Sequence, residues 1–206
     1  MVRRPYDSVK RVIDLVVGSL ALIASAPLQV VLAIVIRRKL GTPVFFRQRR
    51  PGKGEEIFEL VKFRTMIEPD PEAGLVTDAD RMTPFGSFLR STSLDELPTL
   101  WNVVKGDMSL VGPRPLLVRY LDRYSPAQRR RHDVRPGMTG LAQIGGRNSL
   151  SWEEKLALDL QYVRERSLAL DSKIILVTVR MVLARHGITA EGEATMPEFM
   201  SPREAG

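Results

Sequence analysis

Residues 12–36 read V-I-D-L-V-V-G-S-L-A-L-I-A-S-A-P-L-Q-V-V-L-A-I-V-I and are almost entirely apolar. A helix needs about 20 predominantly apolar residues to cross a bilayer, so this stretch is long enough to enter one. It is too long for a cleaved signal peptide, and no clean small-residue cleavage site follows a short apolar core. The chain therefore begins with a segment that is best explained by a membrane.

Basic residues stand on both sides of this stretch. Cations precede it at Arg3, Arg4, Lys10 and Arg11 and follow it at Arg37, Arg38, Lys39, Arg47, Arg49 and Arg50. Because basic flanks favour the cytoplasm, both ends are expected there. Pro27 bends a helix by removing a hydrogen bond, and Ser25 can satisfy the freed carbonyl.

We therefore predict a monotopic protein in which residues 1–40 form a re-entrant hairpin. Its helix enters the membrane, breaks near Ser25 and Pro27, and returns to the cytoplasmic face. A single span with a tolerated kink is the alternative. Asp14, near the point of entry, is expected at the level of the lipid headgroups, where a charge costs less than at the bilayer centre.

Composition narrows the class of partner. The chain has 206 residues and a net charge of +7, which indicates a polyanion: nucleic acid, anionic membrane or phosphorylated substrate. It has no cysteine, which excludes disulfides, thiolate nucleophiles and cysteine zinc sites and fits a cytoplasm-facing protein. No zinc-finger, helix-turn-helix or RNA-binding signature is present, and nucleic acid would not explain the apolar hairpin.

Residues 41–190 are predicted to form a cytoplasmic catalytic domain of the α/β class, mostly helical with one small β-hairpin. Residues 44–46 and 57–61 are expected as its strands, joined by the turn at 51–54. Helices are predicted from Thr83-Pro84 to about Arg90, from the acids at 95–96 through Val104, from a capping box at Ser151 to about Arg166, and from a cap at Asp171. The last of these mixes apolar and basic residues in a way that suits a membrane surface or an ordinary core. Residues 191–206 are predicted to be a polar tail.

The stretch S-T-S-L-D-E-L-P-T-L-W-N, residues 91–102, places Asp95 and Glu96 side by side. Ser93-x-x-Glu96 has the pattern of a capping box, which would make both acids structural. Pro98 weakens that interpretation, because at the fifth helical position it leaves the carbonyl of Leu94 without its usual donor. The residues alone leave a structural and a chemical role open.

Several loops combine arginine with proline or glycine. Arg114 is fixed between Pro113 and Pro115, a rigid mount that suits bidentate binding of a phosphate. Arg147 follows two glycines, Arg135 precedes Pro136-Gly137, and Lys62 lies at the end of a predicted strand. Each loop alone is weak evidence for a function, but together the loops predict a site that binds an anion.

Six motifs in a fixed order carry a resemblance to a known family: K-R-V-I-D, K-F-R-T-M, S-L-D-E-L-P, N-V-V-K-G-D-M-S-L-V-G-P-R-P, R-H-D-V-R-P-G-M-T-G-L-A-Q and G-R-N-S-L-S-W. Over residues 6–200 the chain closely resembles the small monotopic phosphoglycosyl transferases, bacterial sugar transferases that begin glycoconjugate synthesis. The resemblance implies transfer of a phosphosugar from a UDP-sugar to polyprenyl (undecaprenyl) phosphate, with release of UMP, at the cytoplasmic face of the bacterial inner membrane. The minimal length is most similar to the transferases of bacterial N-linked glycosylation, which implies an N-acetylated amino or diacetamido donor. A hexose donor such as UDP-galactose or UDP-glucose is the alternative.

The resemblance also implies roles for single residues. Asp95 would be the nucleophile that forms a covalent phosphosugar intermediate in a ping-pong reaction, and Glu96, with Asp95, would bind Mg²⁺. The implied substrate-binding residues are Lys62, Arg90, Arg114, Arg147, Pro113 and Pro115. His132 is expected to be structural. The expected partners are a UDP-sugar, polyprenyl phosphate and anionic phospholipid, without nucleic acid; the oligomeric state is not fixed, and a homodimer stays open.

Overall fold

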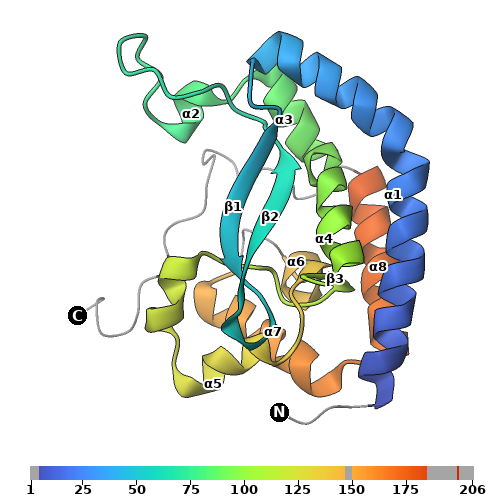
Figure 1. Ribbon diagram of the computed structural model, residues 1–206. Helices are drawn as coiled ribbons and strands as arrows, with labels where there is room; N and C mark the ends of the chain where they lie inside the picture. Colours follow the sequence, from blue (N-terminus) through green and yellow to red (C-terminus); the bar gives the residue numbers. More distant parts are fainter. Residues whose placement is uncertain (1–4, 147–149, 185–198, 200–206) are drawn as a thin grey trace.

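The computed structural model of the chain describes residues 5–146, 150–184 and Phe199 (Figure 1). With η for 3-10 helices, the elements in chain order are α1 (Pro5–Leu40), β1 (Phe45–Pro51), η1 (Lys53–Glu55), β2 (Ile57–Phe63), α2 (Asp78–Arg81), α3 (Pro84–Ser91), η2 (Leu94–Thr99), α4 (Leu100–Lys105), β3 (Ser109–Val111), η3 (Val118–Arg123), α5 (Pro126–Arg129), η4 (Arg130–Asp133), β4 (Gly137–Thr139), α6 (Leu141–Ile144), α7 (Trp152–Glu165) and α8 (Leu168–Leu183). The prediction of a mostly helical chain with little sheet is confirmed.

The β-hairpin is the larger of two small sheets. β1 and β2 pair antiparallel in a register that runs from Phe45 opposite Phe63 to Pro51 opposite Ile57, so the predicted hairpin is confirmed with longer strands. A second sheet was not predicted: β3 pairs parallel with β4, with Ser109 opposite Gly137. Strands this short carry no alternating pattern, and their pairing depends on residues far apart in the sequence.

The helix α1 runs without interruption through Pro27 along a bent course (Figure 1). The predicted break is therefore not seen as a gap between two helices, because proline removes only one hydrogen bond of the ladder. The Ser25 hydroxyl donates to the carbonyls of Ala21, at 2.7 Å, and Leu22, at 3.2 Å, and not to Ile23, whose donor Pro27 lacks. α1 is long and apolar enough to cross a membrane, which for a single N-terminal helix is weak support for membrane association.

The first turns of α1 are tied to the rest of the protein by polar contacts. Asp14 is only 3% exposed and accepts hydrogen bonds from Ser109 Oγ and the Leu110 N–H, both at 3.0 Å. Asp14 is therefore enclosed by protein and not exposed, and its position at the depth of the lipid headgroups stays a prediction. Arg11 donates to the carbonyls of Val103 and Val104, which binds α1 to the end of α4.

Asp171 is not the cap that the sequence predicted. α8 begins earlier, at Leu168, and the N-cap is Ser167, whose side chain accepts from the Leu170 N–H. Asp171 lies buried in the first turn of α8, where it accepts hydrogen bonds from Tyr6, Lys10 and Tyr162. It therefore joins the N-terminal end of α1 to α7 and α8.

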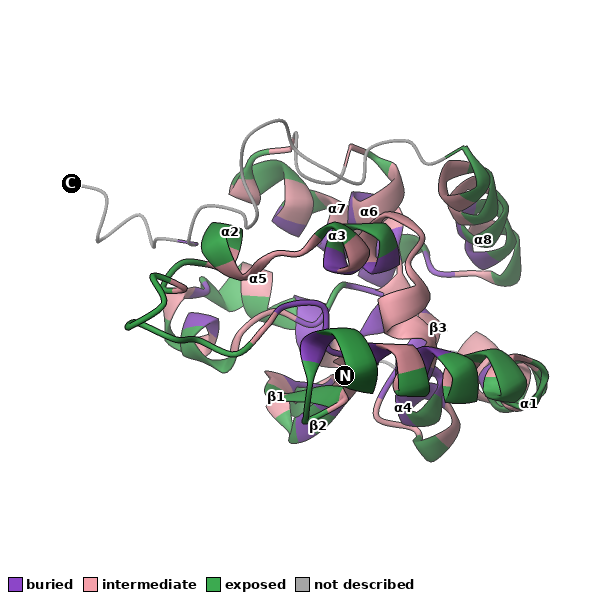
Figure 2. Cartoon of the chain, turned by 90° about the horizontal axis from the view of Figure 1, so that it is seen from above, coloured by how far each residue is buried: buried purple, intermediate pink, exposed green. Residues whose placement is uncertain are grey.

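Two predicted caps are confirmed. The Thr83 side chain accepts from the Gly86 N–H, with Pro84 in the first turn of α3. Ser151 and Glu154 form a reciprocal capping box at the start of α7, which ends at Glu165. Most residues of α1 and α8 are exposed or half-buried (Figure 2), and the exposed apolar side chains of α8 include Leu168, Leu176, Val179 and Leu183. An exposed apolar face of this kind is compatible with the predicted membrane surface.

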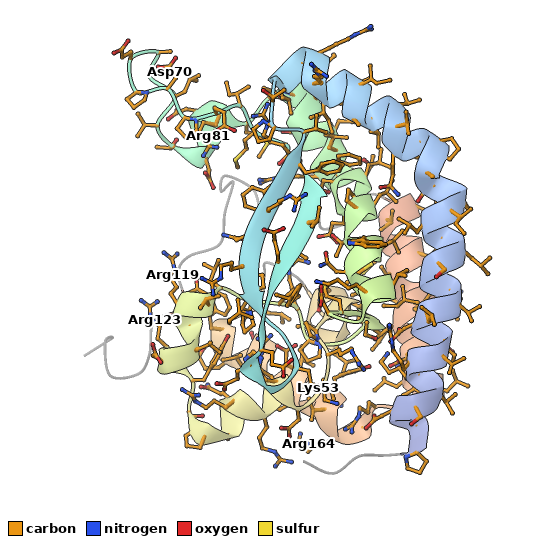
Figure 3. All side chains as sticks on the ribbon, viewed as in Figure 1. Lys53, Asp70, Arg81, Arg119, Arg123 and Arg164 are labelled. Atoms are coloured by element: carbon orange, nitrogen blue, oxygen red, sulfur yellow. The ribbon has the colours of Figure 1, made fainter. Side chains whose placement is uncertain are left out.

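The predicted tail lies outside the described residues except for Phe199. This residue is 2% exposed and packs against three aromatic rings at 5.3 to 5.6 Å, those of Tyr120, Tyr124 and Trp152. Arg119 and Arg123, which lie close together on η3 in Figure 3, both contact the face of the Tyr120 ring. Phe199 is thus anchored against the folded protein.

Candidate active site

Asp95 and Glu96 lie in the 3-10 helix η2, and neither acid belongs to a capping box. Ser93 has φ 56°, in the left-handed region, and its side chain makes no cap hydrogen bond, so that prediction is wrong. The neighbouring residues Leu94 and Leu97 pack against a core that includes Ile36, Phe63 and Leu89. Burial of these two leucines fixes η2 against α1, β2 and α3 and sets the position of the acids.

Glu96 is held by two cations. Its Oε1 lies 2.5 Å from Lys62 Nζ, on β2, and 3.2 Å from Arg114 Nη2, in the loop after β3. Burial alone would raise the pKa of Glu96, but the charges and hydrogen bonds of Lys62 and Arg114 outweigh it and lower the pKa to about 2. Glu96 is therefore an anion at neutral pH. Its Oε2 accepts no hydrogen bond from the residues that the structure describes, which leaves this oxygen free for another ligand.

The pKa of Asp95 is shifted in the opposite direction to that of Glu96. Burial raises the pKa of Asp95 to about 6, the negative charge of Glu96 adds to this rise, and Lys62, Arg114 and Arg90 oppose it. Its carboxylate makes no hydrogen bond and no ion pair with any described residue. A carboxylate that is ionised near neutral pH and has no partner is chemically available, which a nucleophile must be.

Arg90 approaches the acids from α3. Its Nε donates to Thr65 Oγ1 at 3.0 Å. Burial lowers the pKa of Arg90, and the nearby charge of Asp95 opposes this effect. Lys62, Arg90 and Arg114 therefore come from a strand, a helix and a loop to surround the two acids. Arg147, the remaining cation expected at the site, lies outside the described residues.

The backbone of the loop that carries Arg114 is held at successive carbonyls. The Pro113 carbonyl accepts from the Gly137 N–H at 2.9 Å, the Arg114 carbonyl from Arg131 Nη2 at 2.7 Å, and the Pro115 carbonyl from Arg50 Nη1 at 3.2 Å. With two prolines in addition, the loop has little freedom. Pro113 and Pro115 thus act on the position of Arg114.

Arg131 was not singled out by the sequence. Its side chain is 2% exposed and binds Asp159 of α7 through Nε, at 3.1 Å, and Nη2, at 2.7 Å. Asp159 is 5% exposed. Because Arg131 also donates to the Arg114 carbonyl, the buried pair supports the loop of the candidate site. No local pattern links residues so far apart, so only a structure could reveal the pair.

Replacement of Asp159 by Asn should lower the free energy of unfolding by about 3–5 kcal/mol, because it leaves the buried charge of Arg131 uncompensated. Glu55→Gln is the control, since Glu55 pairs with Arg129 at the exposed surface, at 3.0 Å, where loss of a pair costs about 1 kcal/mol or less. Urea unfolding of both variants in detergent, followed by circular dichroism, measures the difference. Equal stability of the two variants would contradict the importance given to the buried pair.

The hydrogen bond of His132 involves the turn of the β-hairpin and not the two acids, and its structural role stays a prediction. Its Nδ1 is 3.2 Å from the Gly52 carbonyl, which connects η4 to the turn of the β-hairpin. Burial lowers the pKa of His132 to about 4, and the charge of Arg131 adds to the effect, so the ring is neutral at pH 7. A pocket of about 280 Å³ beside it is lined by residues of η1, α5 and η4 and does not include the two acids.

Comparison with known proteins gives consistent matches. The sequence model of a family described as bacterial sugar transferase matches residues 5–185. The chain is 48% identical over 191 residues to the uncharacterized sugar transferase EpsL of Bacillus subtilis, covering 92% of this chain and 95% of that protein. It is 41% identical over 192 residues to the UDP-glucose:undecaprenyl-phosphate glucose-1-phosphate transferase of Caulobacter vibrioides, covering 88% and 72%. It is 36% identical over 205 residues to the undecaprenyl-phosphate galactose phosphotransferase of Salmonella typhimurium, covering 91% of this chain but only 43% of that longer protein.

Proposed function

The chain belongs to the bacterial sugar transferase family, and on that basis we propose that it transfers a sugar 1-phosphate from a UDP-sugar to undecaprenyl phosphate and releases UMP. The names of the Caulobacter and Salmonella relatives state an activity of this kind for those proteins. The observation that carries the proposal is the unpartnered carboxylate of Asp95 beside Glu96, surrounded by Lys62, Arg90 and Arg114. Cations of this kind can bind a diphosphate and bring it to an anion that would otherwise repel it.

In the proposed reaction, a carboxylate oxygen of Asp95 attacks the sugar-linked phosphorus of the donor. The bond from that phosphorus to the UMP oxygen breaks, and its electron pair leaves with UMP. The enzyme then holds the phosphosugar as an acyl phosphate. A phosphate oxygen of undecaprenyl phosphate attacks the same phosphorus, the Asp95 carboxylate leaves, and undecaprenyl diphosphate sugar is formed.

The contacts of the two acids favour Asp95 over Glu96 as the nucleophile. Glu96 has one oxygen bound to Lys62 and Arg114, and its pKa of about 2 reflects an anion that these cations stabilise strongly. Asp95 has a pKa of about 6 and no bonded partner among the described side chains. The carboxylate that no described side chain binds is the one available as a nucleophile.

The same acids fit a magnesium ion. Among the described residues there is no group of three or more acidic, histidine or cysteine side chains that could enclose a metal. Mg²⁺ does not require one, because it commonly uses one or two carboxylates together with substrate phosphates and water. Asp95 and the free Oε2 of Glu96 are the residues that would hold it. When bound, the ion would neutralise charge on the diphosphate of the donor.

We place the reaction at the cytoplasmic face of the bacterial inner membrane. Support comes from the apolar helix α1, from the basic residues on both sides of its apolar stretch, and from the exposed apolar face of α8. The bend of α1 (Figure 1) and the presence of Pro27 support the re-entrant course, which would return both ends of the helix to one face of the membrane. The lipid acceptor would then be reached from the membrane surface.

A panel of UDP-sugars tests the function and identifies the donor. Resemblance alone favoured an N-acetylated or diacetamido sugar, but the relatives cited above are named for glucose and galactose, so we expect a hexose donor. Purified protein with undecaprenyl phosphate should release UMP from UDP-glucose or UDP-galactose faster than from UDP-N-acetylglucosamine or a UDP-diacetamido sugar. Faster release from the acetamido donors would restore the first assignment. Release of UMP from none of these donors would argue against the proposed function.

A further inference from the structure

Arg50, near the end of β1, is a half-buried arginine without an acidic partner among the described residues. Its Nη1 donates to the Pro115 carbonyl at 3.2 Å, and its Nη2 donates to Gln48 Oε1 at 2.5 Å. Its Nε is buried and has no hydrogen-bond partner. Arg47 on the same strand has the ordinary arrangement for a surface arginine, an exposed ion pair with Glu59 at 2.7 Å.

The strand register places Arg50 on the same face of the hairpin as Lys62. Residues directly opposite one another in an antiparallel pair share a face, and alternate residues along a strand share it too. Lys62 is opposite Phe46, and Phe46 and Arg50 are separated by an even number of positions on β1. The face that presents Lys62 to Glu96 therefore also carries Arg50, farther along the strand.

Arg50 is also joined to the candidate site through Arg114. Its contact with the Pro115 carbonyl places it against the residue that follows Arg114. Arg114 in turn contacts Glu96, which contacts Lys62. Arg50 therefore lies against the loop that carries Arg114, and it is farther along the hairpin than the Lys62 that contacts Glu96.

The environment of Arg50 is unfavourable for a cation. Burial lowers the pKa of Arg50 to about 10, and the like charge of Arg114 adds to this effect. The guanidinium is still protonated at pH 7, so a half-buried charge persists without an anion. Buried charges are normally paired, and an N–H group without an acceptor carries a further cost. A bound anion that accepts from the remaining Nη1 and Nη2 hydrogens would pair the unpaired charge.

We infer that Arg50 is a further phosphate-binding residue of this site and that its ligand is the phosphate that leaves with the nucleotide. The inference rests on the proposed function. If Asp95 attacks the sugar-linked phosphorus, that phosphate lies next to Asp95, and the phosphate bonded to uridine lies one bridging oxygen farther away. Arg50, which contacts the Arg114 loop and lies farther along the hairpin than Lys62, is placed for this second phosphate. Its guanidinium has donors left for two oxygens of one phosphate.

The test compares Arg50→Gln with Arg49→Gln, which makes the same chemical change at an exposed neighbouring position on the opposite face of β1. Isothermal titration with UMP in the presence of Mg²⁺ measures the dissociation constant. Loss of a charge-assisted hydrogen bond should weaken UMP binding by about 10-fold or more in Arg50→Gln, and Arg49→Gln should bind like the wild type. Binding of uridine, which has no phosphate, should not change. The KM for undecaprenyl phosphate should also stay the same.

Different results separate this inference from the proposed function. If the wild type releases UMP but Arg50→Gln binds UMP normally, the inference fails and the function stands. An increase only in the KM for undecaprenyl phosphate overturns the assignment to the nucleotide side. Equal losses of UMP and uridine binding would mean that Arg50 only supports the Pro115 loop. A wild type that neither binds UMP nor releases it overturns the proposed function and the inference together.

A second variant protects the test against misfolding. If Arg50→Gln has a lower unfolding temperature than Arg49→Gln, Arg50→Lys is used, because lysine keeps the charge and most of the packing volume. Lysine cannot offer two donors in a planar arrangement to one phosphate. Arg50→Lys should therefore bind UMP less tightly than the wild type and more tightly than any folded fraction of Arg50→Gln. Wild-type affinity in Arg50→Lys, with uridine binding unchanged, would overturn bidentate binding by Arg50.

Discussion

Asp95→Asn is expected to lose UMP release by on the order of 10³-fold or more, because removal of a catalytic nucleophile has effects of at least this size. The amide keeps the shape of the carboxylate but has no oxygen anion to attack phosphorus. The variant should still fold, since Asp95 makes no hydrogen bond with the described residues. Loss of activity without loss of structure would separate a chemical role from a structural one.

The covalent intermediate makes this prediction more specific. With the donor alone, the wild type should release up to one equivalent of UMP in a rapid-quench experiment, because the first half-reaction does not need the lipid. Intact-mass measurement should then show the protein heavier by one phosphosugar, on a peptide that contains Asp95. Asp95→Asn should show neither effect. Asp122→Asn, which changes an exposed acid of η3, is the matched control and should behave like the wild type.

Direct transfer in a ternary complex is the competing mechanism. In that case Asp95 would act as a base or a metal ligand, and no UMP would appear until undecaprenyl phosphate is added. Absence of a burst without lipid, together with absence of a mass adduct, would decide in favour of direct transfer. A slow burst in Asp95→Asn, with an adduct on another residue, would identify a different nucleophile.

Features that depend on neighbours in sequence were predictable. The caps at Thr83 and Ser151 each use a side-chain oxygen and a backbone N–H a few residues later, so the pattern contains the whole interaction. The β1–β2 hairpin was predictable for a similar reason, because a turn with glycine separates two apolar strands.

Features that depend on distant partners were not predictable. Asp14 is hydrogen-bonded to Ser109 and Leu110, and Asp171 is hydrogen-bonded to Tyr6 and Lys10. These partners are far away in the sequence, so no local sequence pattern predicts them. The Ser93–Glu96 capping box failed for the same reason: Glu96 interacts with Lys62 and Arg114. A long-range ion pair can outweigh a cap, which contributes only about 1 kcal/mol.

The candidate site was predictable in part. Motif resemblance selected Lys62, Arg90 and Arg114, and the structure brings all three around Asp95 and Glu96. It did not select Arg131, Asp159 or Arg50. In the sequence, Arg50 is one of several arginines in a basic stretch and looks like a solvated surface residue. Only the register of the hairpin and the burial of its Nε distinguish it from Arg47 and Arg49.

Removal of divalent metal is expected to abolish UMP release, and added Mg²⁺ is expected to restore it. The donor brings a diphosphate to a site that already holds two carboxylates. The negative charge of Glu96 already neutralises part of the positive charge of Lys62 and Arg114. Those cations alone are therefore a poor match for the combined negative charge, and phosphoryl transfer generally relies on a metal ion for this purpose. The measurement is UMP release in excess chelator, with chelator already saturated by Mg²⁺ as the control.

Glu96→Gln tests where the ion binds. Glutamine keeps the volume of Glu96 but removes its charge, so the Mg²⁺ concentration for half-maximal UMP release should rise by roughly 10-fold, a size typical for damage to a metal site. Glu59→Gln, which loses an exposed ion pair with Arg47, should leave the Mg²⁺ concentration for half-maximal UMP release unchanged. Full activity in excess chelator would remove metal from the mechanism. Lower activity of Glu96→Gln with an unchanged Mg²⁺ requirement would instead mean that Glu96 acts by holding Lys62 and Arg114 in place.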